Sequence, residues 1–255
     1  MNRVEIDNLI SILQRSSVLA AYDQGPASRA VIADRAGCSR ATVYRAERFL
    51  ETHGLLENSP IGYEITGVGR TILAQTGRFQ AVIEGAINTQ ALLSHTDAVE
   101  LTDLLHLLAD AELVEDDPAI PYHIEHRLHS VVAESDEHIQ VMSRSLGPPR
   151  IIDEMRERVH DGVSFEWIVP TKRIDEFTTV ESNLLTQENA SLYHLGEVSV
   201  DLAIFDETLV VIGFDEHRGV VAVVAMTDEQ EAVAWGKKLI ATYRSEAEPV
   251  TVVKD

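Results

Sequence analysis

The sequence predicts an α/β protein (α+β overall) with a largely helical N-terminal domain and a C-terminal α/β domain. Apolar residues recur at helical spacing over most of residues 3–108, whereas from about Val131 short apolar strands alternate with amphipathic helices. The 255 residues are enough for two modest domains, and a hydrophobic content of 45% is typical of a folded chain. We expect domains at 1–78 and 121–255, joined by a helical linker or dimerisation region at 79–120.

The most informative stretch is residues 28–51. Val31, Ile32 and Ala36 indicate a short helix, which Gly37 ends because glycine adopts a left-handed backbone at low cost. Ser39 is a suitable N-cap for a second helix, whose outer face is basic. This pattern is that of a helix-turn-helix, in which the second helix enters the DNA major groove. The candidate DNA-contacting residues are Arg29, Ser39, Arg40, Ala41, Thr42, Tyr44, Arg45 and Arg48. The alternative is an ordinary helical hairpin with a solvated arginine face.

The second helix also carries a family resemblance. The run from Ser39 to Val43, Ser-Arg-Ala-Thr-Val, resembles the Ser-x-x-Thr-Val opening common in archaeal and bacterial winged helix-turn-helix regulators, and the likeness extends over about 16–74. Residues 55–65 read as two short strands around an Asn-Ser-Pro-Ile-Gly turn, which is a β-hairpin where these regulators have their wing. The tip holds no lysine or arginine, so a hairpin that only completes the core is an equal alternative.

The charge distribution is uneven. The net charge of −21 argues against DNA binding at first, because phosphate repels an acidic surface. Residues 1–78, however, contain nine arginines and eight acidic residues, so the whole acidic excess lies in residues 79–255. Arginine outnumbers lysine 17 to 4, and this composition resembles that of halophilic proteins adapted to molar salt. At such salt the Debye length is about 3 Å, which screens the repulsion.

The remaining N-terminal and central segments are expected to be helical. Residues 3–22 predict one helix, or two broken near Ser16, and Thr66 is expected to cap the next. An apolar stripe then continues to about Leu108, which we interpret as two or three helices with part of the stripe in a homodimer interface. The alternative is that this stripe packs wholly on the C-terminal domain.

No metal, cofactor or membrane contact is expected. The histidines at 123, 126 and 129 drift around a helix, and no Cys or Asp completes a ligand set, so we interpret them as a solvated helix start. Cys38 is the only cysteine and is expected to be a packing residue. No apolar run is long enough for a membrane span, and residues 1–10 lack a signal-peptide core. We therefore expect a cytoplasmic protein.

The C-terminal domain is expected to alternate strands and helices. We predict strands at 139–142, 163–169, 191–195, 198–205, 209–214 and 220–226. We predict helices at 149–160, at 174–188 and after a Thr227 cap. A tight turn at Asp206-Glu207 joins two of the strands.

Residues 199–213 carry a second resemblance, to the strand-turn-strand core of phospholipase D-like domains. Those enzymes have His-x-Lys-x4-Asp there, with a glycine seven residues later, and Asp206 and Gly213 match. Ser199 and Asp201 stand at the His and Lys positions, so the nucleophile and the phosphate clamp are absent. We therefore expect no enzyme activity. A silent domain of this kind behind a winged helix resembles the archaeal TrmB-like regulators and those with a methanogenesis-regulator middle domain.

The resemblance implies a sequence-specific transcriptional regulator that binds a double-stranded DNA operator as a homodimer. The C-terminal domain is then expected to sense a small-molecule effector, through residues that no motif identifies. One alternative is a C-terminal domain that only dimerises. Another is a divergent phosphodiesterase that uses His194 or His217. A third is an interaction module that has lost DNA binding.

Overall fold

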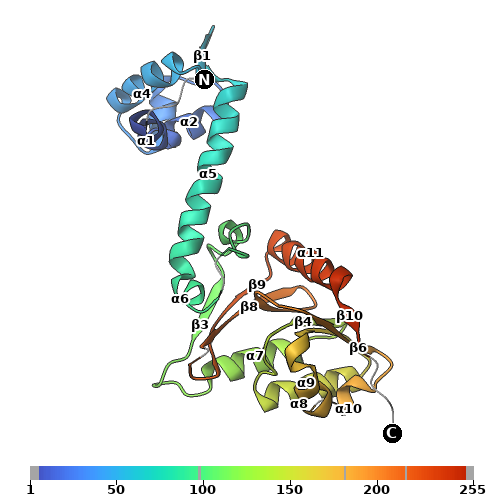
Figure 1. The fold of residues 1–255 in the computed structure, drawn as a ribbon. Helices are drawn as coiled ribbons and strands as arrows, with labels where there is room; N and C mark the ends of the chain where they lie inside the picture. Colours follow the sequence, from blue (N-terminus) through green and yellow to red (C-terminus); the bar gives the residue numbers. More distant parts are fainter. Residues whose placement is uncertain (1–5, 97–98, 181, 216, 251–255) are drawn as a thin grey trace. The chain divides into compact units, whose positions relative to one another are not determined.

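The computed structural model describes residues 6–96, 99–180, 182–215 and 217–250 and divides into two compact units, Met1–Gln80 and Ala81–Asp255 (Figure 1). Each unit is described by itself. Residues 3–5 of the predicted first helix and residue 181 of the predicted helix at 174–188 lie outside the described residues.

The N-terminal unit is a helix-turn-helix with a hairpin. Its elements are α1 (Ile6–Leu13), α2 (Ser16–Asp23), α3 (Arg29–Ala36), α4 (Arg40–Thr52), β1 (Leu56–Ser59), β2 (Gly62–Ile65) and the first part of α5 (Gly67–Asn88). The predicted break near Ser16, the two helices around Gly37 and the hairpin are confirmed. The core is formed by buried side chains of α2, α3, α4, β1 and β2, and includes Leu19, Tyr22, Ile32, Val43, Leu50 and Ile65. Ile12 of α1 and Ile72 and Leu73 of α5 are partly buried and pack against it.

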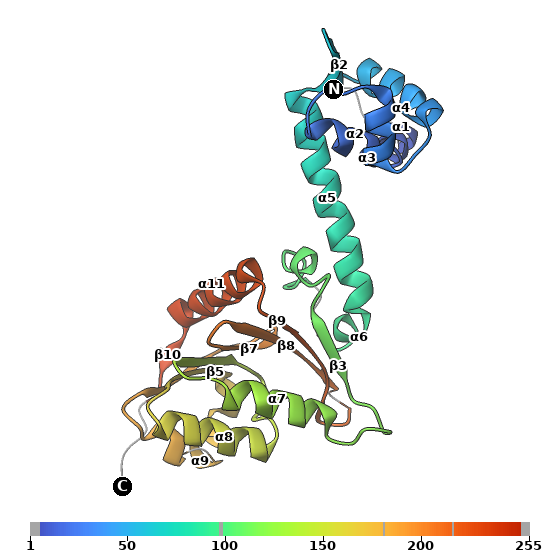
Figure 2. The ribbon, with the colours of Figure 1, turned by 180° about the vertical axis from the view of Figure 1, so that it is seen from behind.

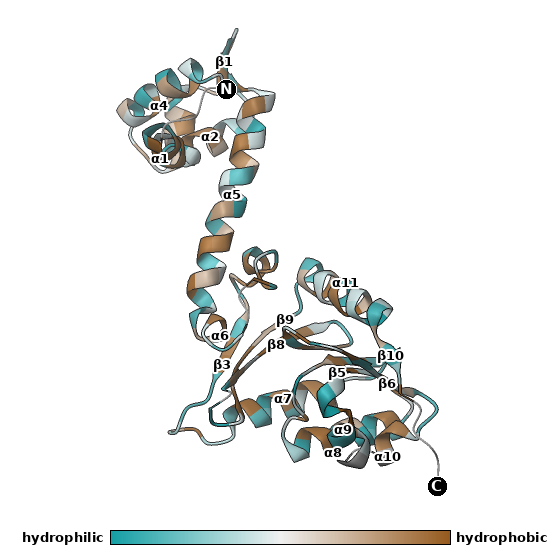
Figure 3. Cartoon of the chain, in the orientation of Figure 1, coloured by the Kyte–Doolittle hydropathy of each residue, from teal (hydrophilic) through white to brown (hydrophobic). Residues whose placement is uncertain are grey.

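Helix α5 is longer than the sequence pattern indicated. It runs unbroken for 22 residues, and Thr66 caps it as predicted, since its Oγ1 accepts a hydrogen bond from the Gly69 N–H at 2.9 Å. Two short pieces follow, α6 (Gln90–Leu93) and the 3-10 helix η1 (Leu105–Leu107). Figure 3 shows apolar and polar bands alternating along α5. The two or three helices predicted over this stretch are one long helix, α5, and the short pieces α6 and η1.

The C-terminal unit contains an eight-stranded mixed sheet in the order β10-β6-β5-β4-β7-β8-β9-β3. Strands β4, β5 and β6 run parallel, and the other neighbours pair antiparallel. The strands are β3 (Glu112–Glu115), β4 (His138–Met142), β5 (Ser164–Pro170), β6 (Ala190–Leu195), β7 (Asp201–Phe205), β8 (Thr208–Asp215), β9 (Val220–Thr227) and β10 (Glu248–Pro249).

Helices cover both faces of this sheet. One face packs against α7 (His123–Ala133), α8 (Pro149–His160), α9 (Ile174–Val180) and α10 (Ser182–Leu185), and the 3-10 helix η2 (Thr171–Arg173) precedes α9. The other face packs against α11 (Gln230–Glu246), α6 and the leucines of residues 101–108 (Figures 1 and 2). Every residue of β7 is buried, because a strand in the middle of a doubly covered sheet has no solvent face.

Most predicted strands and helices of this unit are confirmed, but the following details differ, in addition to the short strand β10, which was not predicted. Strand β3 was missed, because its pattern of one buried residue among four gives no alternation. Strand β7 begins at Asp201 rather than 198. The predicted helix at 174–188 is two short helices, α9 and α10. Helix α11 has Glu229 as its N-cap residue, while the Thr227 hydroxyl accepts a hydrogen bond from the Glu229 N–H at 3.1 Å.

Candidate nucleic-acid interface

The turn between α3 and α4 is defined by backbone hydrogen bonds. Gly37 has φ +63°, and the N–H groups of Gly37 and Cys38 donate to the carbonyls of Asp34 and Ala33. This pattern satisfies the last carbonyls of α3 and requires the left-handed conformation that glycine adopts without strain. The direction in which the chain enters α4 is therefore determined locally, by the sequence Ala-Gly-Cys.

Helix α4 begins at a side-chain cap. The Ser39 hydroxyl accepts a hydrogen bond from the Thr42 N–H at 3.1 Å and lies 2.9 Å from the Thr42 hydroxyl. Val43, Ala46 and Leu50 face the core and anchor the helix. Capping and burial together hold the first turn of α4, which carries most of the candidate DNA contacts, in a single orientation.

The outward face of α4 is basic. We use this term for Arg40, Ala41, Thr42, Tyr44, Arg45 and Arg48, all of which are exposed. The Arg45 Nε is 3.4 Å from the Ala41 carbonyl and the Arg48 Nη1 is 3.4 Å from the Tyr44 hydroxyl, which are long contacts that a ligand can replace. Thus these arginine side chains are held only weakly by their own chain.

Other arginines of the N-terminal unit are tied into its structure. Arg15 lies over the Phe49 ring, Arg35 donates to the carbonyls of Ala21 and Gly25, and Arg70 lies 3.6 Å from the Asp23 carboxylate. These contacts separate arginines that support the fold from those on the outward face of α4.

Arg29 has a structural partner that the sequence did not indicate. Its Nε donates to the carboxylate of Glu47, which is buried on the inner side of α4, and its guanidinium lies 4.9 Å from the centre of the Tyr44 ring. The Tyr22 hydroxyl donates to the same carboxylate at 2.6 Å. Burial, together with Glu47, raises the pKa of Tyr22, and the hydrogen bond to Glu47 raises the pKa of Arg29. The Arg29 side chain keeps about half of its surface exposed, 48%.

The hairpin of β1 and β2 is tied to the end of α4 by Glu51. The Glu51 carboxylate accepts hydrogen bonds from the Asn58 amide at 2.6 Å and from the Tyr63 hydroxyl at 2.9 Å, and the second bond raises the pKa of Tyr63. Glu57 and Glu64 are directly opposite each other across the hairpin. The wing is therefore positioned by contacts with α4 but presents negative charge on its own strands.

The phospholipase D-like positions of the C-terminal unit have structural partners. The Ser199 hydroxyl is hydrogen-bonded to the Tyr243 hydroxyl. Asp201 is buried, and its carboxylate accepts hydrogen bonds from the backbone and guanidinium N–H groups of Arg144. The Asp206 carboxylate accepts three backbone N–H groups, from residues 136–138, at 2.8–3.1 Å. Partial burial opposes ionisation, but these donors outweigh it and hold the pKa of Asp206 below its ordinary value. Asp206, the carboxylate that matches the motif, and Asp201, which replaces its lysine, thus both hold neighbouring loops by hydrogen bonds.

The histidines of α7 do not form a ligand cluster. His129 pairs with Glu154 of α8, at 3.1 Å between Nε2 and Oε2, and His123 and His126 are exposed. No group of three His, Cys, Asp or Glu side chains in the described part of the chain is placed to hold a metal ion. Likewise, none of the helices within the described ranges has the length and apolarity needed to cross a membrane.

Two protein-family models match the chain. Residues 3–87 match the HVO_A0261 N-terminal domain, and residues 121–246 match the middle domain of the methanogenesis regulatory protein FilR1. Neither model matches residues 88–120, which lie between the two matched ranges. The chain thus combines these two domains in the order that its resemblance to archaeal TrmB-like regulators implied. The matches support a DNA-binding regulator of transcription.

Solved structures resemble this regulator at low identity. The archaeal chromatin protein TrmBL2, reported to show a novel mode of DNA binding, is 15% identical over 96% of the regulator and 100% of that chain, with a TM-score of 0.46. NucT from Helicobacter pylori is 14% identical over 55% and 98% of the two chains, with a TM-score of 0.47. Nuc from Salmonella typhimurium, a phospholipase D family member, is 11% identical over 55% and 97%, with a TM-score of 0.45. A search of curated proteins found no match.

The outward face of the regulator's α4 was predicted from the sequence, but the hydrogen bonds of Glu47 with Arg29 and Tyr22 on the inner side of the helix were not. Arg40, Ala41, Thr42, Tyr44, Arg45 and Arg48 lie together on one helix, with Ser39 at its start. Arg29 lies at the start of α3 and reaches this helix through Glu47 and Tyr44. One signal was available: Glu47 falls on the apolar side of α4 beside Val43 and Leu50, where an acidic residue requires a buried partner.

Proposed function

We propose that the chain is a sequence-specific regulator that binds its operator as a homodimer and senses a small molecule through its C-terminal domain. The proposed division is 1–78 for DNA binding, 79–120 for the linker and dimerisation region, and 121–255 for sensing or dimerisation. The family matches supply the DNA-binding role in general terms. The residues, the dimer and the effector are inferred from the features below.

The outward face of α4 carries this proposal. Its first turns would reach the base edges, with Arg45 donating to guanine and Thr42 to either kind of base. Ala41 has a side chain small enough for contact with a thymine methyl group, and Arg40 and Arg48 would pair with phosphates. Arg29 would contribute through the part of its guanidinium that Glu47 leaves exposed.

The acidic wing indicates that the hairpin and α4 contribute unequally to DNA binding. Because Glu57 and Glu64 face each other on the hairpin, the wing would add little attraction to phosphate. In a cell with molar salt, phosphate contacts are weakened in any case, so specificity and affinity would rest on the base contacts of α4.

The homodimer is proposed from two apolar surfaces that the described residues of the chain leave exposed. Phe79, Ile83 and Ile87 recur at four-residue intervals along α5 and are 52%, 42% and 70% exposed. Helix α1 has no buried residue although it carries Ile6, Leu9, Ile10 and Leu13. A second copy of the chain is the proposed occupant, because helix-turn-helix proteins pair their reading helices on symmetric half-sites.

The experiment that tests the proposal is DNA binding by the full chain in about 1–2 M KCl, the range in which surface charge is screened to about 3 Å. Fragments selected from genomic DNA should bind with defined sequence preference, and Arg45→Ala should abolish the preference. Binding that is equal on all sequences, or unaffected by Arg45→Ala, would contradict the proposal.

The second candidate function, phosphodiester hydrolysis, has weaker support. His194 lies on β6 with its Nδ1 3.0 Å from the Thr171 hydroxyl, and His217 lies in the turn between β8 and β9. The two histidines belong to different regions of the sheet, on either side of β7. An activity on phosphodiesters that His194→Ala removes would favour this function.

A further inference from the structure

The C-terminal unit contains a cavity of about 810 Å³ at one end of its sheet. We call it the loop cavity, because its walls are the loop before α7, the loop between β4 and α8, and the turn between β8 and β9, with Arg173 at its margin. Its volume lies in the range of about 300–1,000 Å³ that is usual for sites of small organic molecules.

The walls of the loop cavity combine apolar surface with two guanidinium groups. Leu146, Phe214 and Val221 are partly exposed apolar side chains that line it, and Arg173 and Arg218 line it as well. Three acidic residues, Asp116, Asp117 and Glu125, line it too.

Both arginines have anionic partners that a ligand can replace. The Arg218 Nη1 lies 2.8 Å from the Asp116 carboxylate. The Arg173 Nε and Nη2 lie 3.1 and 2.6 Å from the Glu176 carboxylate, and its Nη1 donates to the Arg144 carbonyl at 2.6 Å. In each pair at least one side chain is more than half exposed, and exposed ion pairs of this kind stabilise a protein by only about 0–1 kcal/mol. An oxyanion that binds Arg218 through two parallel hydrogen bonds would replace the single bond of Arg218 to Asp116, and at Arg173 it would exchange for the two bonds to Glu176.

The acidic residues of the walls are accounted for within the chain. Asp116 pairs with Arg218, and the Asp117 carboxylate accepts the Ala119 N–H at 2.8 Å. Glu125 lies in the first turn of α7, where the helix dipole favours a negative charge. These contacts leave the arginines as the polar groups best suited to orient a ligand.

We infer that the loop cavity binds a small organic oxyanion, with a carboxylate or phosphate group held by Arg173 and Arg218 and an apolar body against Leu146 and Phe214. This inference rests on the proposed function, because it assigns the effector of the proposed regulator to this cavity and defines its chemical class.

The loop cavity is connected to the end of α5 by a continuous run of contacts. Residues 116–122 of its wall follow directly from β3, which pairs with β9. Before β3, the carbonyls of Leu108 and Ala111 accept hydrogen bonds from the Asn88 amide, both at 3.1 Å. The Gly85 backbone lies so close to the Leu105 carbonyl that a Cβ would be 1.7 Å from its oxygen. A shift of the wall would thus be transmitted along β3 to α5.

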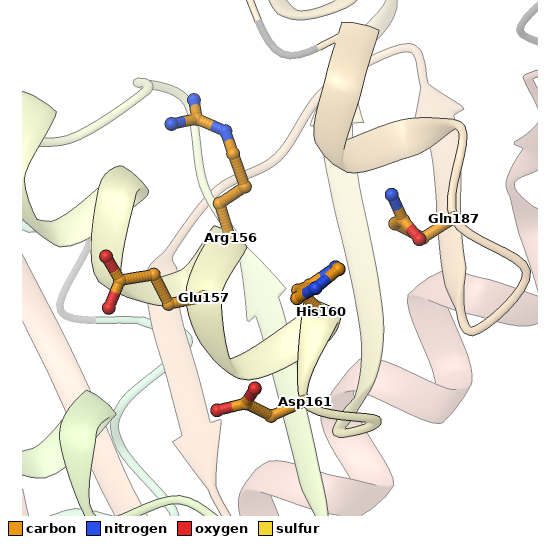
Figure 4. A pocket seen from close by; sticks show the side chains of 5 residues that line it. All are labelled: Arg156, Glu157, His160, Asp161 and Gln187. Atoms are coloured by element: carbon orange, nitrogen blue, oxygen red, sulfur yellow. The ribbon is translucent and has the colours of Figure 1, made fainter.

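A second cavity of the same unit does not have these features. It is a depression of about 450 Å³ on α8, lined by Arg156, Glu157, His160, Asp161 and Gln187. Figure 4 shows the Arg156 guanidinium directed away from His160 and Asp161, so its polar groups do not converge. Arg156 pairs with Asp153 at 2.6 Å, and Arg173 pairs with Glu176 at the same distance; in both pairs the residues are three positions apart. Arg156 is therefore a matched control for Arg173.

The test compares four probes of one size with the full chain: benzoate, phenyl phosphate, benzyl alcohol and benzylammonium, at constant ionic strength. At about ten times its dissociation constant, an oxyanion probe should raise the melting temperature by about 3 °C. Benzoate and phenyl phosphate separate a carboxylate from a phosphate ligand, and a shift by either supports the site. Benzyl alcohol and benzylammonium should give no shift.

Variants locate the binding. Arg218→Ala and Arg173→Lys should each remove at least about tenfold of the probe affinity, whereas Arg156→Ala should leave it unchanged. Arg218 is exposed, so its variant should fold even if the Arg173 variant does not. No shift by either oxyanion at about 20 mM, equal shifts by benzyl alcohol or benzylammonium, or equal losses in Arg156→Ala would overturn the inference.

A second readout separates this inference from the proposed function. A probe that shifts the melting temperature should change the dissociation constant for DNA by about fivefold or more, and Asn88→Ala should reduce that change while the shift remains. A change that Asn88→Ala leaves intact would overturn the route through β3. Specific DNA binding without any probe-induced shift of the melting temperature would overturn the cavity site but not the proposed function. Probe binding without specific DNA binding would overturn the proposed function but not the cavity site.

Discussion

The carboxylate of Glu47 on α4 accepts a hydrogen bond from the guanidinium of Arg29 on α3, on the inner side of the helix-turn-helix. The Tyr22 hydroxyl of α2 donates to the same carboxylate. One buried acidic group thus joins helices α2, α3 and α4 of the N-terminal unit. The angle between α3 and α4 therefore depends on a polar contact as well as on apolar packing.

Replacement of Glu47 should therefore destabilise the N-terminal unit. Glu47→Ala leaves the Tyr22 hydroxyl without its partner inside the core and removes the ion pair of Arg29, so we expect a loss of about 3 kcal/mol in the free energy of unfolding. Urea unfolding followed by circular dichroism measures it. Glu57→Ala, at an exposed position of the hairpin, is the control and should change stability by less than about 0.5 kcal/mol. Equal effects of the two would show that the buried network is unimportant.

Arg45 on the outward face of α4 should determine operator affinity. Arg45→Ala should cost about 1–3 kcal/mol in binding, or about 5–150-fold in the dissociation constant, and should relax the preference at one base position. Fluorescence anisotropy with selected operator DNA measures both. Arg156→Ala removes the same charge from the C-terminal unit and should leave the affinity for DNA within about twofold. Equal losses in the two variants would show that Arg45 acts only through the net charge of the chain.

The acidic wing should weaken DNA binding at low salt. Glu57→Lys replaces the repulsive pair of Glu57 and Glu64 with an attractive one and brings a cation to the hairpin, so affinity should rise by about 2–10-fold at about 0.2 M KCl. The gain should vanish near 2 M KCl, where charges are screened beyond about 3 Å. Glu229→Lys, an equal charge change far along the chain, should give no comparable gain. A gain that persists at high salt would argue for a direct base contact.

Asp206 should stabilise the C-terminal unit in its charged form. Its folded-state pKa lies below the ordinary value, so its contribution is present above the unfolded pKa of about 3.9 and is lost as the pH falls through the folded pKa. Asp206→Asn keeps the φ of +51°, which asparagine tolerates, and should cost about 1 kcal/mol at pH 7. The difference from the parent should shrink as the pH falls below about 4, since both side chains are then neutral. Thermal unfolding at several pH values tests this; a difference that stays constant down to pH 2 would contradict it.

Local signals explain what could be predicted. Gly37 and Ser39 mark the end of α3 and the start of α4 through backbone geometry and a single side-chain cap, so the boundaries of the helix-turn-helix could be read along the chain. The hairpin of β1 and β2 and strands β8 and β9 follow from turn residues and apolar runs in the same way. The outward face of α4 was found because periodicity alone separates its arginines from Val43 and Leu50.

The length of α5 and the edge strand β3 could not be predicted so well. Helix α5 continues through the glycines at 77 and 85, and Gly85 is needed because the Leu105 carbonyl approaches too closely for any side chain. Strand β3 has a single buried residue, and it is a strand because β9 offers it an open sheet edge. In both cases the deciding partner is remote in the sequence.

The amino-acid sequence by itself determined the helix-turn-helix, its basic outer face, the family resemblance and the loss of the histidine and lysine from the phospholipase D-like motif, because each depends on spacing within a few residues. Only the tertiary structure decided that Arg29 meets Glu47, that Asp201 is buried beneath Arg144, and that three distant loops enclose a cavity with Arg173 and Arg218. The physical reason is that a buried charge or a cavity wall is defined by its neighbours in space, and those neighbours are brought together by the burial of the sheet between two layers of helices.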